Sequence, residues 1–411
     1  MKRVFLIIVD GLGIGAQEDA SLYGDSGANT LLSALRASDG ILENFSKLGL
    51  GNLLQRTLED EPEKETSNEH FLKALPQVRQ PLASYGKMRE VSAGKDSTTG
   101  HWELAGLHLE QPFPTYPNGF PDALIQRFCN VCALEGILCN RPYSGTDVIR
   151  DFGEEHQQTG KPIVYTSADS VFQIAAHTET VPLETLYHWC HLAREQVCTG
   201  NNEVGRVIAR PFEGEPGNYR RISEARKDFS SIPPAPNLLT ELQQNRIFTC
   251  SIGKVSDLFA GKGFDTSRKT ESNTEGLQRI HTSICETPSG EKGVFVFANL
   301  IDTDQLFGHR QDPSGYFHCL MEIDNVLPDL LHNLKREDLL IITGDHGNDP
   351  DDESTDHTRE FVPLLVIHGD TRSHAARYLG TRSTFADVSA SVLDWFSVDN
   401  KLPGTSFLQY S

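Results

Sequence analysis

Several stretches of the chain are apolar over most of their length and end at polar residues. They lie at residues 4–9, 247–252, 294–301, 338–342 and 363–367. An apolar run that does not alternate with polar positions is typical of a strand that helices cover on both faces. Stretches of helical character separate these runs. The pattern predicts an α/β protein with a mostly parallel sheet and helices on both faces.

The middle of the chain departs from this pattern. Residues 110–227 carry strands and helices of their own, and prolines mark both ends of the segment. These are Pro112, Pro114 and Pro117 near its start and Pro233, Pro234 and Pro236 just beyond its end. We therefore expect a core domain of residues 1–109 and 228–411 with an inserted α/β cap domain of residues 110–227. A chain of 411 residues is long enough for two such domains.

Composition and charge exclude some classes of partner and indicate the cellular compartment. The net charge of −20 argues against nucleic acids and anionic membrane surfaces as partners. No apolar run approaches 18 residues, and no cleavage signal follows the first strand, so we expect a protein of the cytoplasm. The eight cysteines are scattered, as in a reduced protein. Cys129 and Cys132 lie on a helix expected at residues 121–136 and are interpreted as partly buried thiols. The acidic residues 54–70 are interpreted as a solvated excursion of the core domain.

Polar residues that can bind a metal follow three of the apolar runs. Asp10 follows residues 4–9, Asp304 follows residues 294–301, and Asp345 lies just beyond residues 338–342. The carboxyl ends of strands are where open α/β sheets place their ligand sites. Three histidines lie close by in sequence, namely His309, His346 and His357.

The combination is more specific than any of its parts. An aspartate after a strand is often only a helix cap, and a histidine in a loop is usually a surface residue. Six oxygen or nitrogen ligands at strand ends are harder to explain in that way. Their number fits a two-metal site, which stabilises the attacking and leaving oxygens of an in-line displacement.

A cluster of hydroxyls supplies candidates for a nucleophile. Ser97, Thr98 and Thr99 precede Gly100 and His101 at the start of an expected helix or turn. Such a turn suits a nucleophile whose phosphoryl adduct lies near exposed backbone N–H groups.

Taken together, these segments resemble the phosphopentomutases of the alkaline phosphatase superfamily, and the resemblance covers nearly the whole chain. The motifs are DGLGIG at residues 10–15, GKDSTTGHWE at 94–103, YTSADSVFQI at 165–174, GRVIARPF at 205–212, DQLFGHR at 304–310, DHG at 345–347 and DHTRE at 356–360. The segments at 165–174 and 205–212 are specific to this family. Phosphoglycerate mutases and phosphatases of the superfamily share the metal ligands but not these two segments.

The resemblance implies roles for the candidate residues. One metal would be held beside the nucleophile by Asp10, Asp345 and His346, and a second metal by Asp304, His309 and His357. It also implies manganese as the metal, although zinc fits the same ligands. Phosphopentomutases usually have threonine at the nucleophile position, where this chain has Ser97. We favour Ser97 as the nucleophile, with Thr98 and Thr99 as alternatives.

The resemblance also implies a sugar-phosphate site in the cap. Arg206 and Arg221 would bind a distal phosphate with their forked donors, and Ser167 and Asp169 would bond sugar hydroxyls. In the core, Lys254 would reach the transferred phosphate. His101 and Trp102 are expected to support the nucleophile turn or to pack beneath it.

The function implied is interconversion of α-D-ribose 1-phosphate, or its 2-deoxy analogue, with the 5-phosphate. It would run through a phosphoserine and a 1,5-bisphosphate, with glucose 1,6-bisphosphate or ribose 1,5-bisphosphate as activator. The partners would be pentose phosphates of nucleoside catabolism. A metal-dependent phosphatase and a phosphoglycerate mutase on the same core remain as alternatives. A sugar-phosphate sensor is a third, although a sensor would have no need of a nucleophile.

Overall fold

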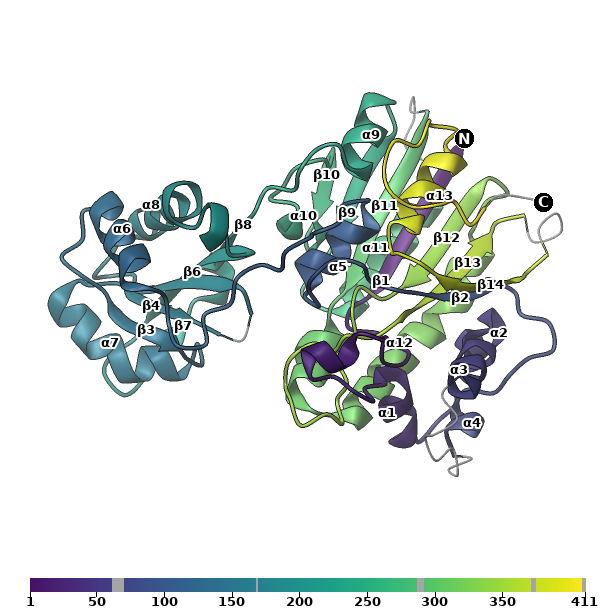
Figure 1. The fold of residues 1–411 in the computed structure, drawn as a ribbon, viewed down its shortest axis with the longest axis horizontal. Coiled ribbons are helices and arrows are strands. Elements are labelled where there is room, and N and C mark those ends of the chain that lie inside the picture. Colours follow the sequence, from purple (N-terminus) through teal and green to yellow (C-terminus); the bar gives the residue numbers. More distant parts are fainter. Residues whose placement is uncertain (61–69, 168, 287–291, 371–374, 409–411) are drawn as a thin grey trace. The chain divides into compact units, whose positions relative to one another are not determined.

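The chain forms two compact units in a computed structural model (Figure 1). The structure describes residues 1–60, 70–167, 169–286, 292–370 and 375–408. The core unit comprises residues 1–111 and 233–411, and the cap unit comprises residues 112–232. The chain returns from the cap unit to the core unit at residue 233, five residues later than expected. The reason is that strand β8 (Lys227–Ser230) still pairs with β6 (Arg206–Glu213) in the cap. Of the predicted acidic excursion, residues 61–69 lie outside the described residues.

An eight-stranded sheet forms the centre of the core unit, in the order β10-β9-β11-β1-β12-β13-β2-β14. The strands are β1 (Lys2–Val9), β2 (Ser84–Met88), β9 (Phe248–Ile252), β10 (Thr266–Arg268), β11 (Gly293–Leu300), β12 (Asp338–Thr343), β13 (Val362–His368) and β14 (Tyr378–Arg382). The five strands from β10 to β12 are parallel. The mixed α/β class and the five predicted strands are confirmed.

One part of the sheet departs from the parallel pattern. Strand β13 runs antiparallel to both β12 and β2. The chain between β12 and β13 contains no helix in the structure. A parallel neighbour requires a crossover, usually through a helix, whereas a chain that turns back directly pairs antiparallel. The loop that makes this return contains Asp345, His346 and His357.

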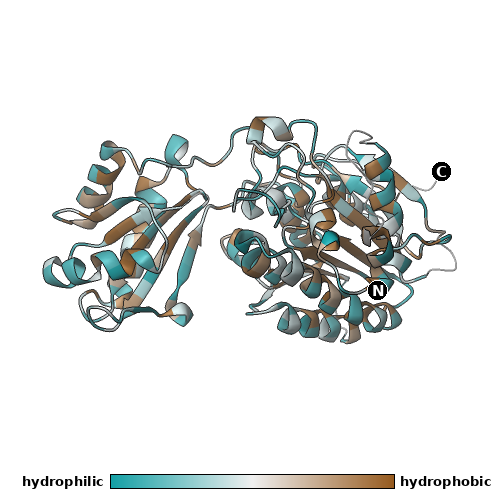
Figure 2. Cartoon of the chain, turned by 90° about the horizontal axis from the view of Figure 1, so that it is seen from below, coloured by the Kyte–Doolittle hydropathy of each residue, from teal (hydrophilic) through white to brown (hydrophobic). Residues whose placement is uncertain are grey.

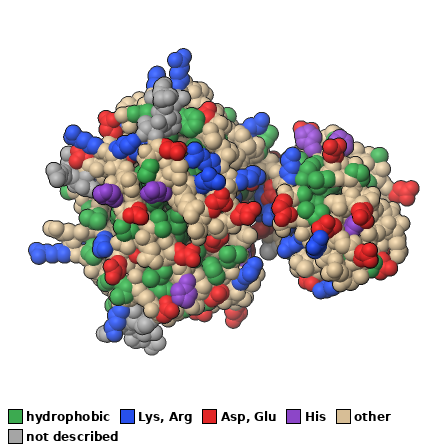
Figure 3. All heavy atoms as spheres, turned by 180° about the vertical axis from the view of Figure 1, so that it is seen from behind, with side chains coloured by type: hydrophobic (Ala, Val, Ile, Leu, Met, Phe, Trp, Pro, Cys, Tyr) green, Lys and Arg blue, Asp and Glu red, His purple; other side chains and the backbone are tan. Residues whose placement is uncertain are grey.

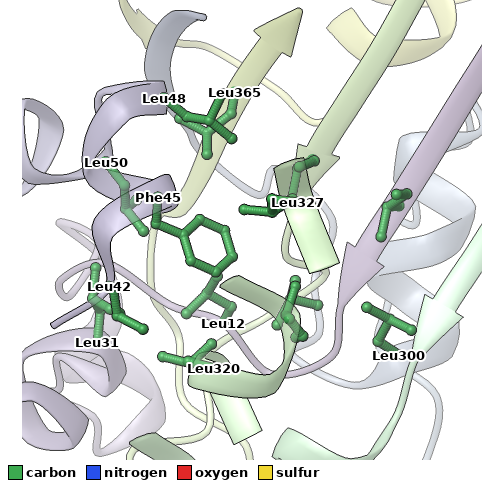
Figure 4. Close-up of a cluster of buried hydrophobic side chains, with 14 of the residues drawn as sticks. Leu12, Leu31, Leu42, Phe45, Leu48, Leu50, Leu300, Leu320, Leu327 and Leu365 are labelled. Carbon is green, nitrogen blue, oxygen red and sulfur yellow. The ribbon is translucent and has the colours of Figure 1, made fainter. Parts of the chain in front are cut away.

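Helices cover both faces of this sheet (Figure 1). They are α1 (Thr30–Arg36), α2 (Glu43–Leu48), α3 (Leu50–Glu59), α4 (His70–Ala74), α5 (Ser97–Leu104), α9 (Leu238–Gln244), α10 (Val255–Leu258), α11 (Asn273–Cys285), α12 (Pro313–His332) and α13 (Asp387–Trp395). On one face, Leu12, Leu31, Phe45 and Leu327 meet in a buried cluster (Figure 4). The cluster fixes the segment after β1, and therefore the position of Asp10, against the helices.

A buried ion pair ties the start of β1 to the start of β12. Arg3 and Asp338 are 1% and 0% exposed, and Arg3 Nε donates to Asp338 Oδ1 at 2.8 Å. Arg3 Nη1 also donates to the carbonyl of Ile284 at 2.7 Å. Asp338→Ala would leave a buried guanidinium without its carboxylate, and we expect it to lower the free energy of unfolding by about 3–5 kcal/mol. Urea titration would measure this.

The matched control for that substitution is Glu43→Ala. Glu43 and Lys47 form an exposed pair at 3.9 Å on α2, and such pairs contribute about 0–1 kcal/mol. Equal losses in the two variants would contradict the role assigned to the Arg3–Asp338 pair.

The cap unit has its own six-stranded sheet, in the order β3-β4-β5-β6-β7 with β8 beside β6. Its elements are α6 (Asp122–Cys132), β3 (Leu138–Pro142), α7 (Asp147–Thr159), β4 (Ile163–Thr166), β5 (Val171–His177), α8 (Leu183–Leu192), β6, β7 (Arg220–Arg221) and β8. Helix α6 is shorter than expected because Ala133 takes a left-handed conformation, with a φ of 53°.

The two faces of the cap sheet are covered differently. Phe172 and Ile174 of β5 pack in a cluster with residues of α6 and α8. Tyr165 and Ala175 point to the opposite face and pack with Val148 of α7. In both units the hydrophobic residues gather on the strands (Figure 2).

The surface and the cysteines agree with the composition. Acidic and basic side chains are interspersed on the face shown in Figure 3. All eight cysteines are free thiols, and burial raises the pKa of Cys132 to about 12. Among the described residues, every helix is too short or too polar to cross a bilayer.

Candidate active site

Four adjacent parallel strands end at the same edge of the core sheet and carry the predicted core residues. Strand β1 leads into Asp10, β12 into Asp345 and His346, β11 into the turn with Asp304 and β9 into Lys254. The strand order β9-β11-β1-β12 makes these ends neighbours. Residues from opposite ends of the sequence therefore meet at one site, which is the position expected for an α/β sheet.

Ser97 is the first residue of α5, and its hydroxyl faces this edge. Ser97 Oγ lies 3.1 Å from His346 Nε2 and accepts a hydrogen bond from Lys254 Nζ at 2.9 Å. Lys254 Nζ also lies 2.5 Å from Asp10 Oδ2. The serine hydroxyl therefore lies among a cation and two of the predicted metal ligands.

The other two hydroxyls of the cluster make different contacts. Asp96 caps α5, accepting hydrogen bonds from the backbone amides of Thr98 and Thr99 and from Thr99 Oγ1. These two amides are thus already bonded within the helix cap. The positive group beside Ser97 is the Lys254 ammonium.

Five of the six predicted metal ligands lie in two overlapping groups. The ligand atoms of Asp304, His309 and His357 lie within 4.8 Å of one another, as do those of Asp10, Asp304 and His346. Asp304 belongs to both groups, and the rings of His346 and His357 lie 4.0 Å apart between centroids.

Asp345 borders the second group. Its Oδ2 lies 3.4 Å from His346 Nε2 and 3.0 Å from His101 Nδ1. Its other oxygen, Oδ1, accepts a hydrogen bond from the Gly11 amide at 3.1 Å. One carboxylate oxygen is therefore used by the backbone, and the other faces the predicted ligands.

The donor set fits divalent cations. Both oxygens of Asp10, Oδ2 of Asp345 and Nε2 of His357 are buried and make no hydrogen bond of good geometry, although Lys254 is close to Asp10. Buried polar atoms of this kind are costly unless something binds them. His346 Nδ1 lies 3.0 Å from the Gly347 carbonyl and His309 Nδ1 lies 2.7 Å from the Thr355 carbonyl. Such contacts fix the tautomer and leave Nε2 as the ligand atom.

Electrostatics of the site follow from packing carboxylates and imidazoles together. Burial opposes charge on His346, but the charges of Asp345, Asp304 and Asp10 raise its pKa to about 10. Burial likewise opposes charge on Asp304, but the close imidazoles of His309 and His357 hold its pKa well below the usual value. Asp304 is thus anionic, and a metal at His346 would replace a proton.

The predicted cap residues lie on or beside β5 and β6. Arg206 Nη2 lies 3.3 Å from Asp169 Oδ2, and Arg206 Nη1 lies 3.5 Å from Asp228 Oδ2. Burial opposes charge on Asp228, but Arg226 and Arg206 lower its pKa. Ser167 is half-buried next to this group.

Arg221 occupies a different part of the same sheet. It pairs with Phe212 on β6, six positions from Arg206, so the two backbone positions lie about 20 Å apart. The Tyr165 hydroxyl and Arg221 Nη1 both lie beside Gly145, because a Cβ built on that glycine would be 3.1 Å from the first and 3.4 Å from the second. The Arg221 guanidinium is therefore near Tyr165.

Comparison with known proteins agrees with the site. A model of the metalloenzyme superfamily matches residues 2–400. The chain is 47% identical to the phosphopentomutase of Dictyoglomus turgidum over 99% of its own length and 98% of that protein. It is 48% identical to that of Deinococcus radiodurans over 98% of both chains. The identity to the phosphopentomutase of Thermotoga maritima is 45%, again over 98% of both chains.

The chain belongs to the phosphopentomutase family. It is accordingly an enzyme, a mutase of the isomerase class, within the alkaline phosphatase superfamily. The resemblance stated from the sequence motifs is confirmed.

Four residues at or near this site were not assigned a role from the sequence. Asn348 Nδ2 donates to Asp304 Oδ1 at 2.7 Å, and Asn299 Nδ2 lies 3.2 Å from His101 Nε2. Glu360 accepts hydrogen bonds from the backbone amides of Gly15 and Thr30. Arg359 is buried in a polar network described below. Asn348, Arg359 and Glu360 lie inside or next to the motifs, and Asn299 lies in the apolar run 294–301. One sequence alone does not indicate which residues they contact.

Proposed function

We propose that the protein interconverts α-D-ribose 1-phosphate, or 2-deoxyribose 1-phosphate, with the corresponding 5-phosphate. The observation that carries the proposal is the position of Ser97 Oγ, with Lys254 Nζ 2.9 Å away and His346 Nε2 3.1 Å away. Membership of the phosphopentomutase family supports the choice of substrate.

The proposed reaction consists of two phosphoryl transfers, one from Ser97 to the sugar and one from the sugar back to Ser97. Phosphorylated Ser97 passes its phosphoryl group to the free hydroxyl of the sugar monophosphate, which breaks the P–O bond to Ser97 and forms a 1,5-bisphosphate. The serine oxygen then takes the other phosphoryl group from the bisphosphate, and the isomeric monophosphate leaves. Lys254 contributes a positive charge beside the oxygen that gains and loses the group. Lys254 is ionised throughout, since burial opposes its charge but Asp10 raises its pKa.

Two divalent metals fit the ligand groups, and manganese is proposed because oxygen and imidazole ligands suit it. Asp10, Asp345 and His346 would hold one ion, and Asp304, His309 and His357 the other. Bound there, the ions would lower the pKa of the serine hydroxyl and neutralise phosphate oxygens. A sugar bisphosphate, such as glucose 1,6-bisphosphate or ribose 1,5-bisphosphate, would prime Ser97.

The cap residues are proposed to hold the sugar phosphate. Arg206 and Arg221 offer forked donors at two separate places on the cap sheet, and Ser167 and Asp169 beside Arg206 offer partners to the hydroxyls. All eight cysteines are free thiols, which supports a reducing compartment, and we propose the cytoplasm.

A coupled assay tests the function. Ribose 1-phosphate with Mn²⁺ and a bisphosphate primer is expected to yield ribose 5-phosphate, and 3-phosphoglycerate is expected to yield no isomer. Release of inorganic phosphate without isomer would indicate a phosphatase and would reject the mutase proposal for these substrates.

Arg206→Ala should separate positioning from chemistry. A charge-assisted contact to the phosphate contributes about 1.5–3 kcal/mol, so catalytic efficiency with pentose phosphates should fall roughly ten- to a hundredfold. Hydrolysis of a small aryl phosphate, if the enzyme has this side activity, should change far less because that substrate lacks the remote phosphate. Arg221→Ala should behave in the same way if both arginines bind one phosphate, and the double variant should then be less than additive.

The control for Arg206→Ala is Arg150→Ala. Arg150 is an exposed cap arginine that pairs with Asp147 and Asp151 on α7, so its loss changes the cap charge equally. Wild-type kinetics in the Arg206 and Arg221 variants would place the sugar-phosphate site elsewhere in the cap.

A further inference from the structure

A single buried arginine joins the metal-ligand loop to the segment before the nucleophile. Arg359 is 2% exposed and lies two residues after His357. Its Nη1 donates to the carbonyls of Ser92 and Gly94, at 2.8 and 2.6 Å, and its Nη2 donates to the carbonyl of Glu90 at 2.8 Å. We call residues 90–97 the nucleophile segment, because Ser97 ends it.

Carboxylates complete the surroundings of this guanidinium. Arg359 Nη1 donates to Glu90 Oε2 at 2.9 Å, and Nη2 donates to Asp19 Oδ2 at 3.1 Å. The guanidinium thus satisfies carbonyls on one edge of the nucleophile segment and donates to two acidic side chains. A planar group with five donors can do this, whereas a lysine ammonium has three donors.

The opposite edge of the segment is held by a different residue. Glu103, on α5 and 0% exposed, accepts hydrogen bonds from the amides of Val91 and Ser92 at 3.0 and 2.7 Å. Its other oxygen accepts from Thr384 and Phe385. These partners all lie outside residues 345–360, so among the described residues Glu103 holds the segment without a hydrogen bond to the metal-ligand loop.

A second bridge runs parallel to the first. The backbone amide of Arg359 donates to Asp25 Oδ2 at 2.7 Å, and Lys95 Nζ donates to the same carboxylate. Lys95 also lies 3.4 Å from Asp356, whose carboxylate accepts from the His357 amide. Both bridges connect residues 356–359, around His357, with the nucleophile segment that ends at Ser97.

From these contacts we infer that Arg359 is a positioning residue that couples metal binding at His357 to the placement of the nucleophile segment. The inference rests on the proposed function, in which His357 binds a metal and Ser97 is the nucleophile. When the metal orders the loop around His357, Arg359 transmits that order to the carbonyls of residues 90–94. Coupling of this kind between two sites is reciprocal in free energy.

Hydrogen exchange of the full-length protein tests the coupling, with Mn²⁺ alone as the probe. The Ser97→Ala background removes any direct bond between the metal and the nucleophile. In that background we expect saturating Mn²⁺ to slow exchange of the amides in residues 91–96 by about five- to a hundredfold. Adding Arg359→Lys should reduce this response to the part carried by the Asp25–Lys95 bridge, which the substitution leaves in place, while the protein still binds Mn²⁺. Adding Glu103→Gln should raise the basal exchange rate but preserve the response.

His357→Ala covers the case in which the Arg359 variant does not fold. With Arg359 intact, removing the metal ligand should abolish the Mn²⁺ response of the same amides. A response that is undiminished in Arg359→Lys, that is equally reduced in Glu103→Gln, or that is absent from the Ser97→Ala background would each overturn the inference.

Kinetics provide a second readout. In the otherwise wild-type enzyme, Arg359→Lys should lower kcat on the order of 10²-fold through misplacement of Ser97, with little change in KM for pentose phosphate. A chain without Mn²⁺ binding or mutase activity would reject the proposed function itself. An active, Mn²⁺-loaded chain with no exchange response would reject only the role of Arg359.

Discussion

Ser97→Ala is expected to abolish mutase turnover, with a loss on the order of 10⁴-fold or more, as when a catalytic nucleophile is removed. No phosphoenzyme can form without the hydroxyl that lies between Lys254 and His346. Metal content should remain unchanged, because the serine adds little to the charge of the site. Steady-state kinetics and elemental analysis would measure the two quantities.

Thr98→Ala and Thr99→Ala serve as matched controls, since they remove neighbouring hydroxyls from the same helix. Thr99→Ala also removes a hydrogen bond to Asp96 and is expected to cost some stability but not the nucleophile. Intact-mass spectrometry of the primed wild type should show one added phosphate, and peptide mapping should place it on Ser97. A phosphate on Thr98 or Thr99 would refute the assignment.

Asp345→Asn and His357→Ala should each reduce bound metal and activity by acting on different ions. We expect two metals per chain in the wild type and a deficit near one in each variant. Activity at limiting Mn²⁺ should fall on the order of 10²–10³-fold, because an incomplete two-metal clamp loses several kcal/mol of transition-state stabilisation. Equilibrium dialysis with elemental analysis would measure the occupancy.

His318→Ala is the control for the histidine variant. His318 lies on α12 of the core unit, where it forms an exposed pair with Asp39 at 3.1 Å. Its loss should leave both metals and activity in place. Full activity of the wild type after exhaustive chelation would contradict the metal assignment and the mechanism built on it.

Much of the site could be predicted because its polar residues lie in short sequence segments that follow apolar runs. Asp10, Asp304 and Asp345 each come soon after an apolar run, and the runs proved to be strands. Lys254 follows the apolar run at residues 247–252, and its ammonium contacts Ser97. Its position depends on β9 lying beside β11, which the residues around Lys254 do not specify.

Other features were missed because they depend on contacts that are distant in sequence. Arg359 donates to carbonyls more than 260 positions away, and no local pattern marks them. Asp96 is a different case, because its capping of Thr98 and Thr99 is a local contact, of the kind that an aspartate just before a helix commonly makes. The end of the cap unit was placed too early because β8 pairs with β6 rather than with the core.

The sequence by itself determined which segments are buried strands, which residue types end them and which family the chain resembles. Local apolar runs carry that information because a strand covered on both faces must be apolar throughout. Only the tertiary structure decided the strand order, the antiparallel course of β13 and the meeting of Ser97, Lys254 and His346 at one edge. Those outcomes depend on pairing and packing between segments far apart in the chain, where no short stretch of residues holds both partners.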